Sequence, residues 1–438
     1  MVLGPPPSGA PLPLLASQQG FTARVSVSST GQQAQGTSLD PALTPDGRFV
    51  AFDSDAPDLV PGDANLTGDV FVHDRLDRTT SLVSVDSFGA QGNGFSFGPS
   101  LSADGRLVAF ESFASNLVPG DANGLSDVFL RDRGTGLTLL VSATAAGTAG
   151  NSRSDNPSLS ADGRFVAFYS FASDLVAGDA NASSDVFVFE AATGALSLVS
   201  VDSAGIQANR NSSTPSISAD GRYVAFVSGA PNLDPGDAND YDDVFRHDRA
   251  TGLTNLVSVA SSGASGNGDC SSPSISADGR FVVFYSVANN LVPGDSNGVG
   301  DAFLRDLRTG LTTRVSVSSS GAQGNGISGN PALSPDGRYV AFQSDATNLV
   351  TPDANGSADV FVHERETGRT VLVSTDSAGA QGNSYSILPV VATHRRLVAY
   401  ASLASNLVTG DTNAKHDIFV FKDKTKIAAV AGPPLRGP

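Results

Sequence analysis

Apolar residues gather in short runs that return along the whole chain at one spacing. In one copy of the pattern, 99–102 forms a short extended run, 107–112 a strongly apolar strand, 127–132 an alternating strand and 137–143 a fourth strand. Each run is rich in β-branched and aromatic residues and is bounded by Gly, Pro, Asn or Asp, which is typical of short strands joined by turns. No stretch keeps a 3.6-residue apolar period, so we expect no helices.

The spacing of the copies is 58 residues, without a slip. The tripeptide Asp-Gly-Arg marks six copies and is replaced in the seventh by His394-Arg395-Arg396; it begins at Asp46, Asp104, Asp162, Asp220, Asp278 and Asp336. Repeats of this kind mark units that bury their apolar faces against their neighbours. Seven repeats of four antiparallel strands predict an all-β fold, a seven-bladed β-propeller.

The ends of the chain predict how the ring closes. Residues 23–27 lie 58 positions before 81–85, so they form a fourth strand that has no blade of its own. We expect this N-terminal strand to dock on the last blade and latch the ring. In the alternative, a segment near 425–430 completes that blade. The predicted domains are a flexible tail at 1–21, the propeller at 22–432 and a C-terminal tail at 433–438.

Composition narrows the partners. The 438 residues are 40% apolar, enough for a large core, and their net charge of −17 disfavours nucleic acid and anionic membranes, both of which need a basic patch. No apolar run approaches the length of a membrane span, so membrane insertion is not expected. Cys270 is the only cysteine, so an intramolecular disulfide is excluded. Residues 1–20 lack the basic start of an export signal.

The strongest candidate for a functional site is a metal site at the repeated motif Asp-x-Asn-x-x-x-Asp. Three oxygen-bearing side chains at positions 1, 3 and 7 of a tight loop suit a hard cation, and carbonyls and water complete the six to eight oxygens that Ca²⁺ takes. The predicted calcium ligands are Asp63, Asn65, Asp69, Asp121, Asn123, Asp127, Asp179, Asn181, Asp185, Asp237, Asn239, Asp243, Asp295, Asn297, Asp301, Asp353, Asn355, Asp359, Asp411, Asn413 and Asp417.

A second interpretation of these loops needs no metal. Asp-x-Asn also forms hydrogen-bonded Asx turns, and the loops lack the bidentate Glu of an EF-hand. In either case, up-and-down blades place all seven loops and the Gly-x-Gln-Gly-Asn crossings between blades on one face. We expect that face to be acidic and rich in amides. It would then bind cations or a basic partner, or form only a solvated rim.

Signals for catalysis are weak, and we predict no catalytic residue. His73, His247 and His363 share one position of the repeat, where other copies carry Arg131 or Phe189. That tolerance indicates a surface or blade-edge position. The chain has no Gly-x-Ser-x-Gly elbow and no His cluster at metal-ligand spacing.

The sequence of the repeat resembles that of a known family. Residues 334–342 read Ser-Pro-Asp-Gly-Arg-Tyr-Val-Ala-Phe, followed by Asp-Val-Phe at 359–361, and this pattern is similar to the TolB-type, WD-like propeller repeat. The resemblance covers about 22–432. It implies the propeller fold, and such propellers occur as periplasmic or secreted interaction modules, as gating domains of serine peptidases and in some polysaccharide lyases.

Together these observations favour a non-enzymatic binding or structural module, Ca²⁺-stabilised through the Asp loops and located in the periplasm or outside the cell. Its partner, a protein or a glycan, and its oligomeric state stay open. The first alternative is a propeller enzyme of polysaccharide lyase or lactonase type with a metal on the ring axis. The second is a self-assembling surface or filament subunit.

Overall fold

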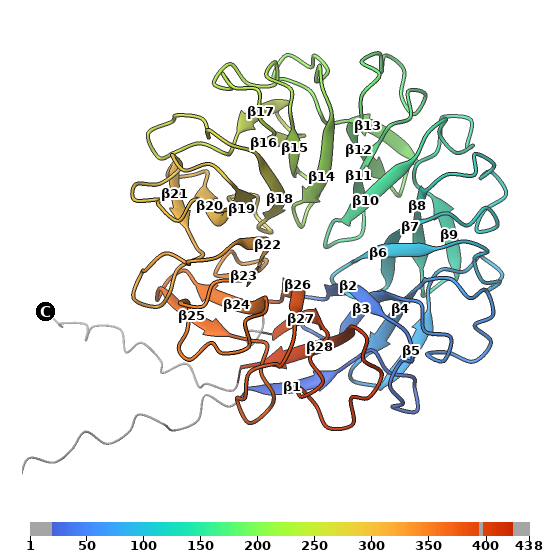
Figure 1. The fold of residues 1–438 in the computed structure, drawn as a ribbon. Helices are drawn as coiled ribbons and strands as arrows, with labels where there is room; N and C mark the ends of the chain where they lie inside the picture. The colour runs from blue at the N-terminus through green and yellow to red at the C-terminus, as the bar shows by residue number, and fades with distance from the viewer. Residues whose placement is uncertain (1–19, 394–396, 424–438) are drawn as a thin grey trace, which may run out of the picture.

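The computed structural model describes residues 20–393 and 397–423, which form seven four-stranded antiparallel sheets around a central axis (Figure 1). No helix occurs within these two ranges. The predicted seven-bladed propeller is therefore confirmed. Sheets β2–β5, β6–β9, β10–β13, β14–β17, β18–β21 and β22–β25 are blades 1 to 6 in chain order, and β26–β28 with β1 are blade 7.

Each blade repeats the same strand bounds. The innermost strands are β2 (Ser38–Leu43), β6 (Ser96–Leu101), β10 (Ser154–Leu159), β14 (Ser212–Ile217), β18 (Cys270–Ile275), β22 (Ser328–Leu333) and β26 (Ser386–Val391). The second strands are β3 (Phe49–Ser54), β7 (Leu107–Ser112), β11 (Phe165–Ser170), β15 (Tyr223–Ser228), β19 (Phe281–Ser286), β23 (Tyr339–Ser344) and β27 (Leu397–Ser402).

The third strands are β4 (Asp69–Asp74), β8 (Asp127–Asp132), β12 (Asp185–Glu190), β16 (Asp243–Asp248), β20 (Asp301–Asp306), β24 (Asp359–Glu364) and β28 (Asp417–Lys422). The outermost strands are β5 (Thr79–Leu82), β9 (Leu137–Leu140), β13 (Ala195–Leu198), β17 (Leu253–Leu256), β21 (Leu311–Arg314), β25 (Arg369–Leu372) and β1 (Phe21–Arg24).

The core lies between blades and is built around a stacked pair of rings in each blade. In blade 2, Phe110 of β7 and Phe129 of β8 are fully buried, with ring centroids 5.8 Å apart. They pack against Val70 and Val83 of blade 1. Because every blade buries its face against the next one, no blade has a complete core of its own.

The Asp-Gly-Arg turns join blades at the opposite end from the Asp loops. Arg106 Nε and Nη2 donate to the two carboxylate oxygens of Asp132 at 2.8 and 2.6 Å, which ties the first hairpin of the blade to the end of its third strand. Gly105 has a φ of +68°, and a Cβ there would lie 2.2 Å from the Phe49 ring of the preceding blade. Only glycine suits both conditions.

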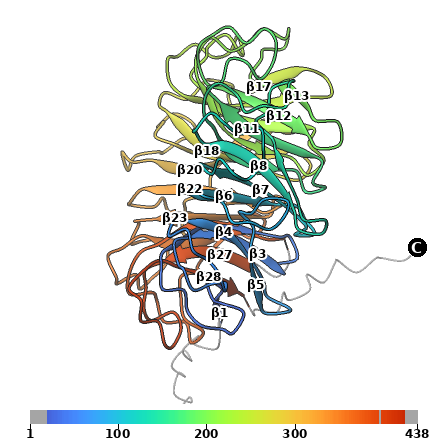
Figure 2. The ribbon, with the colours of Figure 1, turned by 90° about the vertical axis from the view of Figure 1, so that its right-hand side faces the viewer.

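The N-terminal strand latches the ring, as predicted. β1 pairs with β28 in antiparallel register from Phe21–Lys422 to Arg24–Phe419, and the two strands lie side by side in Figures 1 and 2. The strand begins at Phe21, one residue before the predicted domain start. The alternative latch near 425–430, the tail at 433–438 and most of the tail at 1–21 lie outside the described residues.

Two strand boundaries differ from the prediction. The outermost strand of blade 2 ends at Leu140 and does not reach 143, because the hydroxyl of Ser142 accepts the Val128 N–H that a further ladder bond would use. The innermost strand begins earlier than predicted, at Ser96, and contains a bulge between Phe97 and Ser100. The bulge accommodates Pro99, which has no N–H to donate.

Candidate functional site

The last Asp of every Asp loop begins the third strand and is completely buried. In blade 2, Asp127 Oδ1 accepts a hydrogen bond from Ser142 Oγ at 2.6 Å. The same Ser–Asp bond recurs in all seven blades, at 2.5–2.6 Å. Half of the fourteen motif carboxylates are thus internal to the blades, and the loop face displays less negative charge than the sequence suggests.

The middle Asn of the motif forms the Asx turn that the second interpretation predicts. Asn123 Oδ1 accepts the Leu125 N–H at 2.7 Å. Its Nδ2 donates to Asp127 Oδ2 at 2.7 Å and to the Gly150 carbonyl at 3.0 Å. The loop is therefore tied both to its own third strand and to the crossing that leads to the next blade.

A glutamine in the crossing joins the two carboxylates of the motif, and sequence reasoning missed this role. In blade 1, Gln91 Nε2 donates to Asp63 Oδ1 and to Asp69 Oδ2, both at 2.7 Å. Equivalent bridges come from Gln33, Gln207, Gln323 and Gln381, at 2.6–3.0 Å. The available signal was the recurrence of Gln 28 residues after the first Asp of the loop. These bonds also place the crossings and the Asp loops on one face, which we call the loop face.

Two blades add a cation of their own to the bridge. Arg314 Nη1 lies 3.2 Å from Asp295 Oδ1 and 3.3 Å from Asp301 Oδ2 in blade 5. Arg24 Nη1 lies 3.7 Å from Asp411 and 3.3 Å from Asp417 in blade 7. Across the described chain, no three His, Cys, Asp or Glu side chains cluster closely enough to hold a metal. Calcium in these loops stays a prediction.

The shared histidine position is not a blade edge, and that prediction was wrong. His73, His247 and His363 are 6–7% exposed. Each ring makes a hydrogen bond of 2.9 Å through Nδ1 to a threonine of the outermost strand. Burial lowers the pKa of His73 and of His363 to about 4, so both rings are neutral at physiological pH. Arg131 suits the same position because its guanidinium reaches the corresponding threonine, Thr138.

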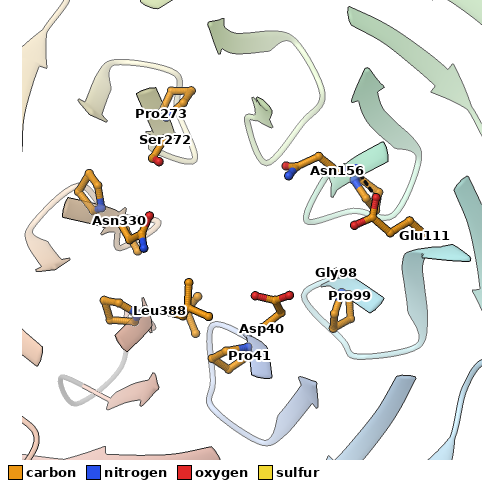
Figure 3. A pocket seen from close by; sticks show the side chains of 15 residues that line it. Asp40, Pro41, Gly98, Pro99, Glu111, Asn156, Ser272, Pro273, Asn330 and Leu388 are labelled. Carbon is orange, nitrogen blue, oxygen red and sulfur yellow. Dashed lines mark hydrogen bonds between the residues drawn. The ribbon is translucent and has the colours of Figure 1, made fainter. Parts of the chain in front are cut away.

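A cavity lined by both polar and apolar residues opens on the ring axis. Its volume is about 370 Å³, and it is lined from six blades by the bulges of the innermost strands. At each bulge, a residue in the left-handed region precedes a proline, and these residues differ between blades: Asp40, Gly98, Asn156, Thr214, Ser272, Asn330 and Leu388, with φ of 44–60°. Figure 3 shows Asp40, Asn330 and Leu388 directed toward the open centre. We call this cavity the channel mouth.

Two acidic side chains, Asp40 and Glu111, line the channel mouth, and the carboxyl of Asp53 lies beside Asp40. Asp53 is 7% exposed and its Oδ1 has no hydrogen-bond partner in the described chain, while the carboxyl of Asp40 lies close enough to interact with it. Burial, followed by the charge of Asp40, raises the pKa of Asp53 well above its ordinary value. Burial raises the pKa of Glu111 to about 8, although Glu111 Oε2 accepts the Asn156 N–H at 3.0 Å. No lining residue is basic.

The channel is polar at one end and apolar at the other. The innermost strands run from the loop face toward the Asp-Gly-Arg turns, so Asp40 lies nearer the loop face than Leu43 does. The far end holds a cavity of about 180 Å³ lined by Leu, Ile, Ala and Pro from six blades. A charged ligand would therefore find polar partners only from the side of the loop face.

Comparison with known proteins returns structural likeness alone. No known family profile matches the sequence, and no curated protein matches it. The propeller domain of the Trilobed protease from Pyrococcus furiosus is similar with a TM-score of 0.55 at 13% identity, over 88% of this chain and 93% of that one. An oligogalacturonate lyase in complex with manganese gives 0.54 at 12% identity, over 92% and 96%.

TolB from Acinetobacter baumannii is also similar, with a TM-score of 0.40 at 15% identity over 76% of this chain. This chain matches 62% of the TolB chain's length. At these identities the likenesses to the protease propeller and to the lyase show the fold, which is the propeller that the sequence resemblance implied. The activities of the similar proteins differ from one another, so the fold does not select a function for this chain.

Proposed function

We propose that this protein is a non-enzymatic binding propeller whose channel mouth receives a positively charged group of a partner. The observation that carries the proposal is that the half-buried Asp40 and the buried Glu111 line the mouth, with the buried Asp53 beside Asp40 and no basic residue in the lining. A buried carboxyl without a counter-charge costs folding free energy. A lysine or arginine side chain of a partner would offset this cost and release the protons that the cluster holds.

The variation around the mouth supports recognition of an asymmetric ligand. The positions that build the blades repeat from copy to copy, whereas the residue before the bulge proline is Asp, Gly, Asn, Thr, Ser, Asn and Leu in turn. The acidic residues belong to blades 1 and 2, and the corresponding residue of blade 7, which adjoins blade 1, is Leu388. A ligand with one charged end and one apolar side would fit this arrangement.

The same cluster favours the enzyme alternative, in which a divalent metal binds on the axis. Carboxylates are ligands for Mn²⁺ and Ca²⁺, and a similar propeller, the lyase, was solved with manganese. Among the described residues at the mouth, the carboxyls of Asp40 and Asp53 lie close to each other. Mn²⁺ and a polygalacturonate cleavage assay therefore test this alternative.

The test is calorimetric titration of the full chain with pentalysine at pH 8.5 and 150 mM salt. Pentalysine should bind, and Asp40→Asn combined with Glu111→Gln should weaken binding at least tenfold. The matched control is Asp345→Asn, which removes an exposed charge from the loop face away from the axis. Equal weakening by the control would reduce the effect to net charge and refute the proposal. Cleavage of polygalacturonate that depends on Mn²⁺ would establish the enzyme alternative instead.

We further propose that the protein acts outside the cytoplasm, in the periplasm or the surrounding medium, where Ca²⁺ can stabilise the loop face. Extracellular modules bind this ion at 10⁻⁴–10⁻³ M, which suits loops with few carboxylates. No described helix is long and apolar enough to cross a membrane. Cell fractionation tests the location. Light scattering at rising concentration tests the self-assembling alternative, which a strictly monomeric protein would exclude.

A further inference from the structure

Five of the seven Asp loops are closed by a glutamine amide, and two are not. In the crossings that follow blades 2 and 4, the position of the bridging glutamine is occupied by Ala149 and Ser265. The rest of each loop is built in the usual way. Asp127 accepts from Ser142 and Asn123 at 2.6 and 2.7 Å, and the equivalent Asp243 has the same two kinds of partner.

The missing amide leaves buried carboxylate oxygens without partners. Asp121 in blade 2 is 6% exposed, and neither of its oxygens has a hydrogen-bond partner in the described chain. Asp237 in blade 4 is 7% exposed; its Oδ1 accepts only the Asn239 N–H at 3.2 Å, and its Oδ2 has no partner there. In the other five loops, the amide reaches the first Asp at 2.7–2.9 Å.

The two carboxylates of each open loop lie close enough to repel one another. In the closed loops a single amide nitrogen reaches both carboxylates, as Gln207 Nε2 does at 2.8 Å to Asp179 and at 2.8 Å to Asp185. The equivalent acids of blades 2 and 4 have the same places in the repeat and lack this donor between them. An unpartnered carboxylate that faces a second one in a buried site is costly unless a positive charge or a donor lies between them.

The chain itself places a positive charge at this position in two other blades. Arg24 and Arg314, at the ends of β1 and β21, bring a guanidinium nitrogen within 4 Å of both loop carboxylates. The equivalent residues in blades 2 and 4 are Leu140 and Leu256, which carry no charge. At these two positions, blades 2 and 4 therefore lack both the amide donor and the arginine, and the arginine near Asp237, Arg210, forms its ion pair with Asp240 at 2.9 Å.

We propose that blades 2 and 4 each bind one Ca²⁺ between their two loop carboxylates, Asp121 with Asp127 and Asp237 with Asp243. In the other five blades the glutamine amide takes the place of the ion. The inference rests on the proposed role of calcium on the loop face and limits it to two of the seven loops. Two carboxylates balance the charge of the ion, and neutral oxygens from the backbone and water complete its coordination.

The experiment measures how many ions the full chain binds, after treatment with a chelator, by equilibrium dialysis against ⁴⁵Ca²⁺ at up to 10 mM. We expect two ions per chain. Ala149→Gln and Ser265→Gln should each remove one ion, and the double variant should bind none. These substitutions copy the residue that five other blades already accommodate, and circular dichroism checks that the variants fold. The melting temperature of the double variant should no longer depend on Ca²⁺, because a ligand of the folded state stabilises it by mass action.

A reverse substitution provides a second, independent test. Gln207→Ala removes the amide that joins Asp179 and Asp185 in blade 3, so it should raise the count from two ions to three. Binding of no ion at 10 mM Ca²⁺, binding of seven ions, or retention of two ions by the double variant would each overturn the proposal. Loss of the ions in Asp40→Asn with Glu111→Gln would place calcium at the channel mouth and would also overturn it. Loss of pentalysine binding alone in that variant leaves the two-ion count standing.

Discussion

Replacing Glu111 with glutamine should stabilise the protein, and the gain should grow as the pH rises. Glu111 is 5% exposed, and burial raises the pKa of its carboxyl from 4.5 to about 8. The unfolded chain loses this proton near pH 4.5, whereas the folded chain keeps it to about pH 8. The stability that the protonated group contributes is therefore complete below pH 4.5 and is lost as the pH rises through 8.

The magnitude follows from the pKa difference, at about 1.4 kcal/mol per pH unit. Ionisation of the unfolded chain costs the wild type about 1 kcal/mol of folding free energy at pH 5, about 3 kcal/mol at pH 7 and about 4.5 kcal/mol at pH 8.5. Glutamine has no proton to lose and still offers an oxygen to the Asn156 N–H, which Glu111 accepts at 3.0 Å. Glu111→Gln should remove this whole pH dependence.

The chain contains its own precedent for the substitution. Gln343, at the equivalent position of blade 6, accepts the Leu388 N–H at 3.0 Å through Oε1. The reverse change, Gln343→Glu, should therefore introduce a loss of stability with rising pH. That loss should be smaller than for Glu111, because Gln343 is only partly buried.

Urea unfolding at pH 5, 7 and 8.5 measures the free energy of unfolding of the wild type and both variants. Comparing the wild type with each variant at the same pH separates the effect of Glu111 from that of Asp127. The raised pKa of Asp127 changes stability with pH in the same direction in all three proteins. A gain from Glu111→Gln that is the same at pH 5 and pH 8.5, to within about 0.5 kcal/mol, would refute the reasoning. It would mean that the carboxylate is ionised and solvated at the channel mouth, and the proposed affinity for a cationic group would lose its basis.

Two further predictions test the ring itself. Phe110→Ala should lower the free energy of unfolding, measured in urea, by about 3–5 kcal/mol, because the ring is fully buried against Phe129. The control Phe113→Ala, at a ring that is 49% exposed, should lower it by under about 1 kcal/mol. Equal losses would contradict the packing between blades. A chain that begins at residue 25 lacks β1 and leaves β28 as an open edge, so its melting temperature should fall and it should associate with rising concentration. A chain that begins at residue 20 is the control, and equal behaviour of the two would show that β1 is not the latch.

The fold could be predicted because the same pattern of strands and turns occurs seven times in the sequence. Residues 107–112 and 127–132 were expected as strands, and β7 and β8 have these bounds. The outermost strand was placed less well, since the side chain of Ser142 and not the backbone closes the ladder there. The local sequence pattern does not reveal that a side-chain hydrogen bond replaces a backbone one, because serine occurs in both strands and turns.

The contacts of the site were harder to predict than its elements. The motif carboxylates were expected to face a cation or to form Asx turns, but their main partner is the amide of a glutamine 22 to 28 residues away, as Gln91 shows. The histidine position was misread for a related reason. Tolerance of His and Arg suggests exposure, yet both side chains reach the equivalent buried threonine of their own blade, Thr80 for His73 and Thr138 for Arg131. Residue types alone do not distinguish a variable surface position from a buried position at which either His or Arg makes the required hydrogen bond.

Comparison of the seven copies with one another shows that charge compensation is less complete on the loop face than at the Asp-Gly-Arg end. At the Asp-Gly-Arg end, the acid that ends the third strand has an arginine partner in blade after blade, as with Arg48 and Asp74 or Arg280 and Asp306. On the loop face the compensation is incomplete, because Asp121 lacks the amide that its equivalents have. The acids of the channel mouth lack any basic neighbour among the residues that line it. Since the same fold pairs these groups elsewhere, the unpaired ones are not required by the architecture, and a bound cation or a basic partner is the physical agent that would compensate them.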